Sequence, residues 1–295
     1  MSKLAEHLPI LQVVVPLLGA LLCALLRRGT LAWALALAVS WIMPVIAILL
    51  LQRVLDGGAI SYRLGGWAPP WGIEYRVDLL SAFVLVLVTV VGAAIMPFAR
   101  RSVAHEIEGD KQAWFYTMYL LCLTGLLGIT VTGDAFNIFV FLEISSLSTY
   151  VLIAMGKDRR ALLAAYQYLI VGTIGATFYV IGVGLLYLVT GSLNIVDIAA
   201  RLAPAAAETS RPVFAALAFL TVGVSLKLAL FPLHVWLPGA YAHAPSVATA
   251  FLAGTATKVA VYVLLRLIFS IFGVAIAFDT LPVSEVLLTL SVAAM

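Results

Sequence analysis

Long apolar runs separated by short polar segments dominate the sequence. A bilayer hydrocarbon core about 30 Å thick takes roughly 20 residues of α-helix to cross. Eight runs are of this length, and each predicts one membrane-spanning segment. The runs are Leu8–Leu26, Leu31–Leu51, Leu79–Ala99, Ala113–Thr132, Ala135–Met155, Ala161–Val189, Pro212–Phe231 and Val247–Leu265.

The residues within these runs favour helices over the strands of a membrane barrel. Gly, Ala and Leu dominate the runs, and apolar and polar residues do not alternate as they do in barrel strands. A ninth run begins near Val286 and is cut off at Met295, which makes it too short to cross a bilayer. The pattern predicts an all-α polytopic membrane protein with about eight transmembrane helices and a truncated ninth.

Composition excludes a water-soluble globular protein. Of the 295 residues, 64% are hydrophobic and only 11% are charged, and the mean hydropathy is +1.13. Soluble domains carry about 25% charged residues. The net charge is only +3 and no basic patch is interleaved with aromatic residues, so a nucleic acid is not expected as a partner. Cys23 and Cys122 lie inside apolar runs, which is typical of core residues rather than of a disulfide or metal site.

Cations in the connections predict the orientation of the chain. The side with more of them is expected to be cytoplasmic, because short loops near span ends follow the positive-inside rule. This assignment places the N-terminus outside. Eight cations fall on the inner side: Arg27, Arg28, Arg100, Arg101, Lys111, Lys157, Arg159 and Arg160. Six fall on the outer side: Lys3, Arg53, Arg63, Arg76, Arg201 and Arg211.

Two connections have a character of their own. The Arg53–Arg76 segment contains paired glycines and Pro69-Pro70, so we expect an irregular external loop with Trp67 and Trp71 at the membrane interface. The Ile195–Leu202 segment is amphipathic and is expected to lie along the membrane surface.

Three charged residues lie inside predicted spans instead of in connections. Glu143 is nine residues past Asp134, which at 1.5 Å per residue is about 13 Å into its span. Lys227 and Lys258 lie at comparable depths. A charge at the bilayer centre costs about 2.5 to 3.5 kcal/mol on insertion scales, so each of these groups requires pairing, hydration or neutralisation.

Two interpretations of the three charges remain open. In the structural one, Glu143 forms an ion pair with one lysine while the other lysine extends toward an interface. In the functional one, the groups form a proton relay, because burial lowers the proton affinity of a lysine and a nearby carboxylate restores it. Ser145, Ser146 and Ser148 follow Glu143 and either hydrate its carboxylate or bond back to their own helix.

The segment Phe231–Pro238 predicts a broken helix between the seventh and eighth spans. It is apolar and aromatic, and Pro232 and Pro238 bracket His234. Unwound backbone at membrane depth is tolerated only where it is buried in protein or faces a water-filled cavity. We therefore expect a non-helical backbone over residues 230–236 and a relay or capping role for His234. His243 is expected to form hydrogen bonds at the interface, and two histidines without a third ligand do not predict a metal site.

Glycines of the sixth span predict close helix packing. Gly172, Gly175, Gly182 and Gly184 recur at helical spacing, and small residues let helices approach closely in membranes. No strand precedes Gly182-Val183-Gly184, so it does not resemble a dinucleotide-binding fingerprint.

Three segments together resemble the antiporter-like membrane subunits. These are Gly133–Leu147 (GDAFNIFVFLEISSL), Lys227–Pro238 (KLALFPLHVWLP) and Ala242–Ser246 (AHAPS). The family includes proton-pumping subunits of respiratory complex I, membrane-bound hydrogenases and Mrp-type sodium/proton antiporters, and the Mrp D subunit shows the greatest likeness. The resemblance is specific across Ala113–Arg266, whereas the first three spans agree only in their pattern.

The resemblance implies an architecture and a proton pathway. Residues 1–112 would form three N-terminal helices with an external loop, residues 113–270 a five-helix proton-channel repeat, and residues 271–295 the start of a second, inverted repeat. In the family, a glutamate of the fifth helix pairs with a lysine of the broken seventh helix, and a lysine of the eighth helix continues the path. The matching positions here are Glu143, Lys227 and Lys258, with His234 in the place of the family's histidine after the break.

The function implied first is that of a proton-translocating subunit of a multi-subunit sodium/proton antiporter in the bacterial inner membrane. The alternatives are a proton-pumping subunit of a redox complex, of the NADH:quinone oxidoreductase or membrane-bound hydrogenase type, and a non-conducting scaffold. The sequence has no cysteine cluster and no nucleotide motif, so no cofactor is expected on this chain. The expected partners are other membrane subunits, the lipid bilayer, protons and, for an antiporter, sodium.

Overall fold

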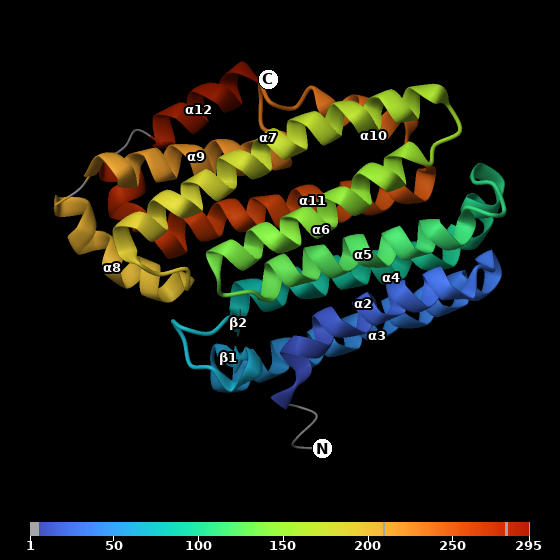
Figure 1. The fold of residues 1–295 in the computed structure, drawn as a ribbon, viewed down its shortest axis with the longest axis horizontal. Coiled ribbons are helices and arrows are strands. Elements are labelled where there is room, and N and C mark those ends of the chain that lie inside the picture. Colours follow the sequence, from blue (N-terminus) through green and yellow to red (C-terminus); the bar gives the residue numbers. More distant parts are fainter. Residues whose placement is uncertain (1–5, 209, 281–282, 295) are drawn as a thin grey trace.

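A bundle of long helices is the main feature of the computed structural model, which describes residues 6–208, 210–280 and 283–294 (Figure 1). Eight of the helices formed by these residues are long and apolar enough to cross a membrane. The spanning helices are α2 (Leu8–Leu26), α3 (Gly29–Gly57), α4 (Leu79–Glu106), α5 (Gln112–Val131), α6 (Ala135–Ala154), α7 (Arg159–Thr190), α9 (Ser210–Leu228) and α11 (Ser246–Leu265), the last continued by a π-helix over Arg266–Phe272. The chain is thus an all-α polytopic membrane protein, as the apolar runs predict.

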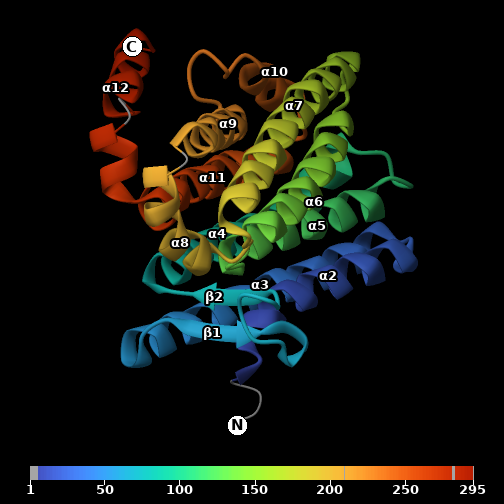
Figure 2. The same cartoon turned by 60° about the vertical axis from the view of Figure 1, so that its left-hand side comes forward.

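Shorter elements lie at the ends of the bundle or cross it. Helix α8 (Ile195–Glu208) lies across one end, helix α10 (Trp236–His243) follows the break after α9, and α12 (Val283–Ala293) lies near the C-terminus (Figure 2). In α8, Ile198 and Leu202 are buried while Val196 and Arg201 are exposed, which agrees with the amphipathic segment expected there.

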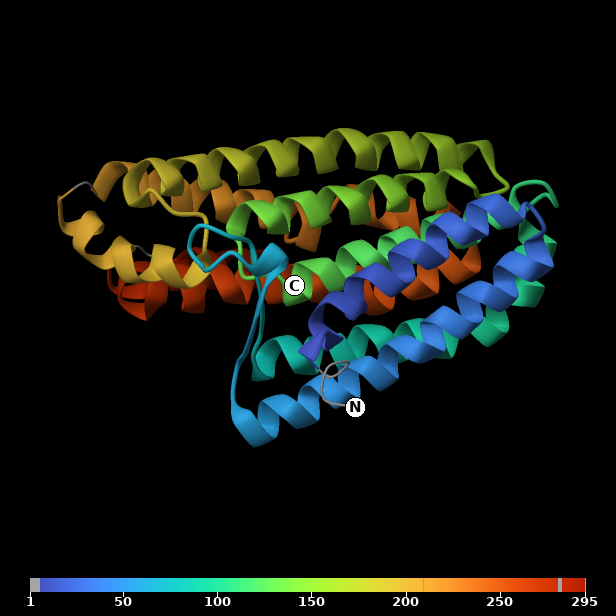
Figure 3. The ribbon, with the colours of Figure 1, turned by 60° about the horizontal axis from the view of Figure 1, so that its bottom comes forward.

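The helices pack as two groups that share α5. Helix α3 packs against α2 and α4, and all three pack against α5 (Figure 3). Helices α6, α7 and α9 follow on the other side of α5, and α11 contacts α4, α5, α6 and α9. Helix α5 is the most enclosed of the described spans, because most of its residues are buried inside the protein. The five-helix region that carries the candidate site is therefore built around α5 and α11.

The connection between α3 and α4 differs from the irregular loop expected from its glycines and prolines. It contains an antiparallel hairpin of β1 (Ile60–Arg63) and β2 (Glu74–Val77). Strand β2 is anchored to the bundle, because Tyr75 and Val77 are buried and the Gly133 amide donates to the Glu74 carbonyl. The turn residues are visible in the sequence, and both strands alternate apolar and polar residues, but four residues each is the lower limit of length at which such a pattern predicts a strand. Trp67 and Trp71 are exposed, and their place at the membrane interface stays a prediction.

Glycines allow α7 and α9 to approach closely, which confirms the expected packing role for Gly175 and Gly182 but not for Gly184, where nothing lies within 4 Å of an added Cβ. A Cβ atom added at Gly182 would lie 2.5 Å from Leu220 Cγ, and one added at Gly175 would lie 3.1 Å from the Gly223 carbonyl oxygen. Because no larger residue fits without displacing the backbone or a core side chain, these positions fix how near α9 lies to α7.

Helix α4 contacts the antiparallel helix α11 through one carboxylate at each end. Asp78 caps the start of α4 through the Ser81 amide (2.9 Å) and forms an ion pair with Arg266 at the end of α11. At the opposite end, Glu106 accepts a hydrogen bond of 2.8 Å from the Ser246 amide, the first residue of α11. Burial raises the pKa of Asp78, but hydrogen bonds from Arg266 and Ser81 outweigh this effect and hold the pKa below its usual value.

The Asp78–Arg266 pair predicts a pH-dependent effect on stability. Asp78→Asn is expected to lower the melting temperature of the detergent-solubilised protein at pH 7, because a charge-assisted hydrogen bond contributes about 1.5 to 3 kcal/mol. A carboxylate with a lowered folded-state pKa stabilises the protein above its unfolded-state pKa and loses that effect as pH falls through the folded-state value. The difference between wild type and variant should therefore shrink below about pH 4. Equal melting temperatures at pH 7 would contradict this role.

Candidate proton-pathway site

Lys227 lies near the end of α9 and is buried in the middle of the helix bundle. Its side chain is only 8% exposed. The Nζ atom donates hydrogen bonds to Ser146 Oγ and to the Tyr150 hydroxyl, the latter at 3.3 Å. It also lies over the rings of Tyr150 and Tyr168, 5.7 and 5.6 Å from their centroids. Two hydroxyl oxygens and two aromatic rings thus take the place of water around the buried Lys227 ammonium.

The break after α9 forms one wall of this site. Helix α9 ends at Leu228, residues 229–235 are non-helical, and Trp236 begins α10. This agrees with the non-helical backbone expected over residues 230–236, except that Trp236 is already helical. Trp236 donates to the Leu226 carbonyl at 3.0 Å and stacks on Tyr168 with ring centroids 3.8 Å apart. The break therefore places the Trp236 indole beside Lys227. The indole N–H donates to the Leu226 carbonyl, one of the last carbonyls of α9.

Glu143 lies on α6 near Lys227 but does not form the ion pair expected between them. Among the described residues, no lysine or arginine nitrogen lies within 4.0 Å of its carboxylate. Its Oε1 atom is buried and has no hydrogen-bond partner in the described part of the chain. Ser146 lies one turn further along α6 and, with Tyr150, binds the ammonium instead. The depth of the two charges was evident from the sequence, but the competing hydroxyls decide which groups touch.

The serine cluster after Glu143 bonds mainly to its own helix. Ser145 and Ser146 both donate to the Leu142 carbonyl, at 2.9 and 2.6 Å, and Ser148 donates to the Ile144 carbonyl. Of the three, Ser146 also accepts a hydrogen bond from Lys227. The alternative of back-bonding therefore holds for all three, and Ser146 has a second role at the lysine.

A small cavity lies beside Lys227. Its volume is about 30 Å³, and its lining includes Ser146 and Tyr168 on one side and Thr257 of α11 on the other. A polar cavity of about 10 to 15 Å³ is enough for one water molecule. The cavity is thus large enough to hydrate the ammonium between α6, α9 and α11.

Lys258 lies on α11 but points to a different environment. Its side chain is exposed on the surface of the bundle, and its Nζ donates to the Ala253 carbonyl (2.6 Å) and to Thr257 Oγ1 (3.3 Å). Thr257 lines the cavity at Lys227. The described helices therefore enclose one of the two lysines and leave the other at the surface.

His234 lies within the break but does not line the cavity at Lys227. The ring is partly buried against Phe231, with centroids 5.5 Å apart, and its Nδ1 atom has no hydrogen-bond partner among the described residues. His243 lies at the end of α10, with Nδ1 4.0 Å from Asp158 Oδ2, which is an ion-pair distance and too long for the hydrogen bond expected there. The structure therefore does not place His234 in direct contact with Lys227.

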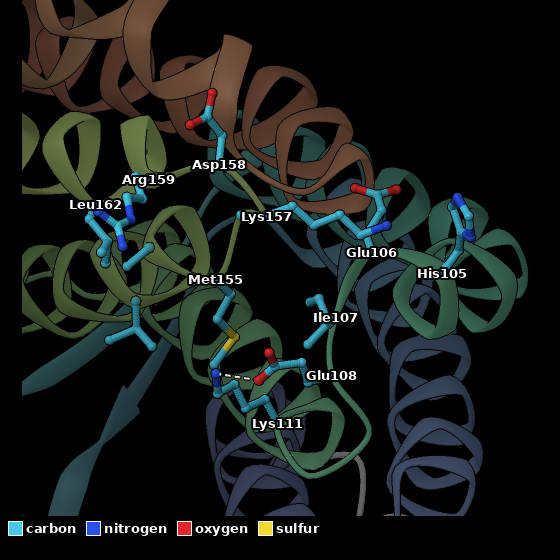
Figure 4. Close-up of a pocket in the computed structure, with 13 residues that line it drawn as sticks. His105, Glu106, Ile107, Glu108, Lys111, Met155, Lys157, Asp158, Arg159 and Leu162 are labelled. Carbon is cyan, nitrogen blue, oxygen red and sulfur yellow. Dashed lines mark hydrogen bonds and ion pairs between the residues drawn. The ribbon is translucent and has the colours of Figure 1, made fainter.

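A larger cavity, of about 610 Å³, lies away from these residues at the ends of α4, α5, α6 and α7 (Figure 4). Glu106 and Lys157 face one another across it, and Lys111 pairs with Glu108 at 2.6 Å. In the described part of the chain, no three His, Cys, Asp or Glu side chains gather as metal ligands would.

Comparison with known proteins agrees with this arrangement. The family model described as "NADH:quinone oxidoreductase/Mrp antiporter, TM" matches residues 132–295, more than half of the chain. The chain belongs to this family. The matched region contains Glu143, Lys227, Lys258 and the break between α9 and α10.

Several relatives in the antiporter family show how far the likeness extends. The N subunit of NADH-quinone oxidoreductase from Desulforudis audaxviator is 42% identical over 90% of this chain and 53% of its own length. The D subunit of the Na(+)/H(+) antiporter from Bacillus subtilis is 31% identical over 89% of this chain and 52% of its own. A chain in the membrane-bound sulfane sulfur reductase, an archaeal respiratory membrane complex, superimposes with a TM-score of 0.83 at 30% identity, covering 88% of this chain and 53% of that one. The chain thus spans about half the length of the curated relatives it matches.

Three aromatic residues of the site were not identified from the sequence of this antiporter-family chain. Tyr150 had a detectable signal, because residues 143, 146 and 150 share one face of an otherwise apolar helix. Tyr168 had none, since a tyrosine in a long apolar span is also typical of a membrane interface. Trp236 was noted as part of the break, but its stacking on Tyr168 depends on how α10 folds back.

Gly172 tests how tightly the site is packed. A Cβ atom added there would lie 2.0 Å from the Tyr150 hydroxyl oxygen and 3.2 Å from Lys227 Nζ. We expect Gly172→Ala to displace the tyrosine and to reduce proton transport. Gly184→Ala on the same helix is the control, because nothing lies within 4 Å of its added Cβ. Transport by Gly172→Ala equal to that of the control would show that the tyrosine position is unimportant.

Proposed function

We propose that the chain is a proton-translocating subunit of a multi-subunit membrane complex and that Glu143, Lys227, Lys258 and His234 carry its proton pathway. The observation that supports this most directly is the buried Lys227, which lies beside a cavity of about 30 Å³ and near a Glu143 carboxylate oxygen without a hydrogen bond. We further propose that residues 113–270 form the conducting unit and that the complex lies in the bacterial inner membrane with the N-terminus outside.

The geometry suits movement of a proton rather than storage of a fixed charge. A structural ion pair would place both charged groups in contact, because a buried charge is stabilised only by close pairing and full hydrogen bonding. Here the ammonium is bound by neutral hydroxyls and the carboxylate oxygen is left unpartnered. Small shifts of the lysine side chain therefore change the charge that each group experiences, and with it the proton affinity of each.

Lys258 supports a role within a larger assembly. It lies eight residues before Arg266 and 13 after Pro245 on α11, about 12 and 20 Å from these residues along the helix. A lysine stem of four carbons is too short to bring its ammonium from that depth to water. We therefore propose that polar groups outside the described helices cover Lys258 and receive the proton there.

The favoured complex is a sodium/proton antiporter, and a redox-driven pump is the second candidate. The antiporter assignment is supported by the three motif segments and by the 31% identity to a D subunit of a sodium/proton antiporter. The redox assignment is supported by the 42% identity to a subunit of an NADH-quinone oxidoreductase. Inverted vesicles that contain the complete complex separate the two: proton movement started by NaCl alone supports the antiporter, and proton movement that requires NADH or another electron donor supports the redox pump.

Glu143 and Lys227 provide the test of proton translocation itself. Glu143→Gln and Lys227→Met are each expected to abolish proton movement in inverted vesicles followed with a pH-sensitive dye, whereas Glu143→Asp retains part of it. The amide of glutamine fills the space of the carboxyl group but does not exchange a proton at physiological pH. Glu108→Gln, an exposed substitution at the end of the bundle, is the control. Full proton movement with both Glu143→Gln and Lys227→Met would show that this chain does not carry the proton. A non-conducting scaffold would then be its function.

A further inference from the structure

Lys227 is bound in this structure by groups that do not belong to the expected glutamate–lysine pair. Ser146 Oγ and the Tyr150 hydroxyl accept its hydrogen bonds, and the Tyr150 and Tyr168 rings face the ammonium. We propose that Ser146, Tyr150 and Tyr168 form a second binding position for the Lys227 ammonium, which we call the hydroxyl seat, and that these three positioning residues hold the lysine away from Glu143 during transport. The proposal rests on the proton-translocating function given above.

The hydroxyl seat and Glu143 lie within reach of one flexible side chain. Glu143, Ser146 and Tyr150 follow one another on the same face of α6, and seven residues of helix rise by about 10 Å from the first to the last. Lys227 reaches this face from α9 on a stem of four methylene groups and contacts Ser146, which lies one helical turn from Glu143. In the proposal, rotation of this stem transfers the ammonium from one position to the other.

The seat is built to bind the charged form of the lysine. Hydroxyl oxygens accept hydrogen bonds from an ammonium, and aromatic faces attract a cation but have no such attraction for a neutral amine. Trp236 stacks on Tyr168, which holds that ring in place, and Gly172 leaves room for the Tyr150 hydroxyl. The seat therefore stabilises a protonated Lys227 with no carboxylate in contact.

The two positions make the charge of Glu143 and the location of Lys227 interdependent. An ionised Glu143 attracts the ammonium out of the seat, whereas a protonated Glu143 has no charge with which to compete. By linkage, a lysine held in the seat makes protonation of Glu143 easier to the same extent. The seat thus gives Glu143 a state in which it takes up a proton, and departure of Lys227 from the seat gives a state in which that proton is released.

The titratable groups around Lys227 come from several helices. Glu143 and Tyr150 lie on α6, Tyr168 on α7, Tyr241 on α10 near Tyr168, Cys122 on α5 and Lys258 on α11. Tyrosine and cysteine side chains are neutral near pH 7, so Glu143 is the acidic group in this set that competes with the seat. Lys258 points to the bundle surface and its Nζ bonds to its own helix.

The pH dependence of transport tests the proposal. Without the seat, Lys227 either stays at Glu143 or loses its proton, and both changes require a higher proton concentration for transport. We expect Ser146→Ala and Tyr150→Phe to move the alkaline half-maximum of proton transport to lower pH by about one unit, a tenfold change in proton concentration. Tyr168→Leu should shift it in the same direction, whereas Tyr168→Phe, which keeps the aromatic face, should shift it much less.

Matched controls separate this effect from structural damage. Ser148→Ala removes a hydroxyl that bonds only to the Ile144 carbonyl of α6, and Tyr119→Phe removes a buried hydroxyl that bonds to the Gly92 carbonyl. Both should keep the native half-maximum, and Ser146→Thr, which restores a hydroxyl, should return to it. Equal half-maxima for Ser146→Ala, Tyr150→Phe and the controls would overturn the seat while leaving the transport function intact. Native transport by Lys227→Met would instead overturn the proposed function.

Discussion

Burial of the Lys227 ammonium in an apolar environment is the constraint on which the central part of the molecule depends. A charged group at that depth is stable only where hydrogen-bond acceptors, aromatic faces or water replace its hydration shell. The protein supplies these from α6 and α7, and a cavity of about 30 Å³ adds room for water. The positions of α6 and α7 relative to α9 are therefore constrained by the contacts of the Lys227 ammonium as well as by apolar packing.

The close approach of α7 to α9 and the break after α9 serve the same site. Glycines at positions 175, 182 and 223 bring the two helix backbones together, and Gly172 leaves space for the Tyr150 hydroxyl against α7. The break then returns Trp236 to the site, where it stacks on Tyr168 and donates to the Leu226 carbonyl near the end of α9. A continuous helix would carry this indole away and leave one side of the tyrosine uncovered. The break after α9 and the glycines of α7 and α9 thus both shape the surroundings of Lys227.

The sequence predicted the features that depend on long patterns and missed those that depend on side-chain contacts. The eight spans followed from runs of apolar residues, and Glu143, Lys227 and Lys258 stood out because charges are rare in such runs. The hairpin over Ile60–Val77 was not predicted, because each strand has only four residues and its alternation of apolar and polar residues is correspondingly brief. The partners of Lys227 were not predicted either, since a flexible side chain can reach Glu143, Ser146 or Tyr150 and sequence spacing does not distinguish among them.

Lys227 and Lys258 both place a charged group within a membrane-spanning helix, but their surroundings differ. The described helices enclose Lys227, whereas Lys258 is exposed and bonds only to its own helix. Thr257 connects the two environments, because it lines the cavity at Lys227 and its hydroxyl accepts a hydrogen bond from Lys258. In the proposed pathway, a proton at the cavity would be separated from the surface of α11 by Thr257 alone. The proposal therefore requires a polar partner at the exposed Lys258 to receive that proton.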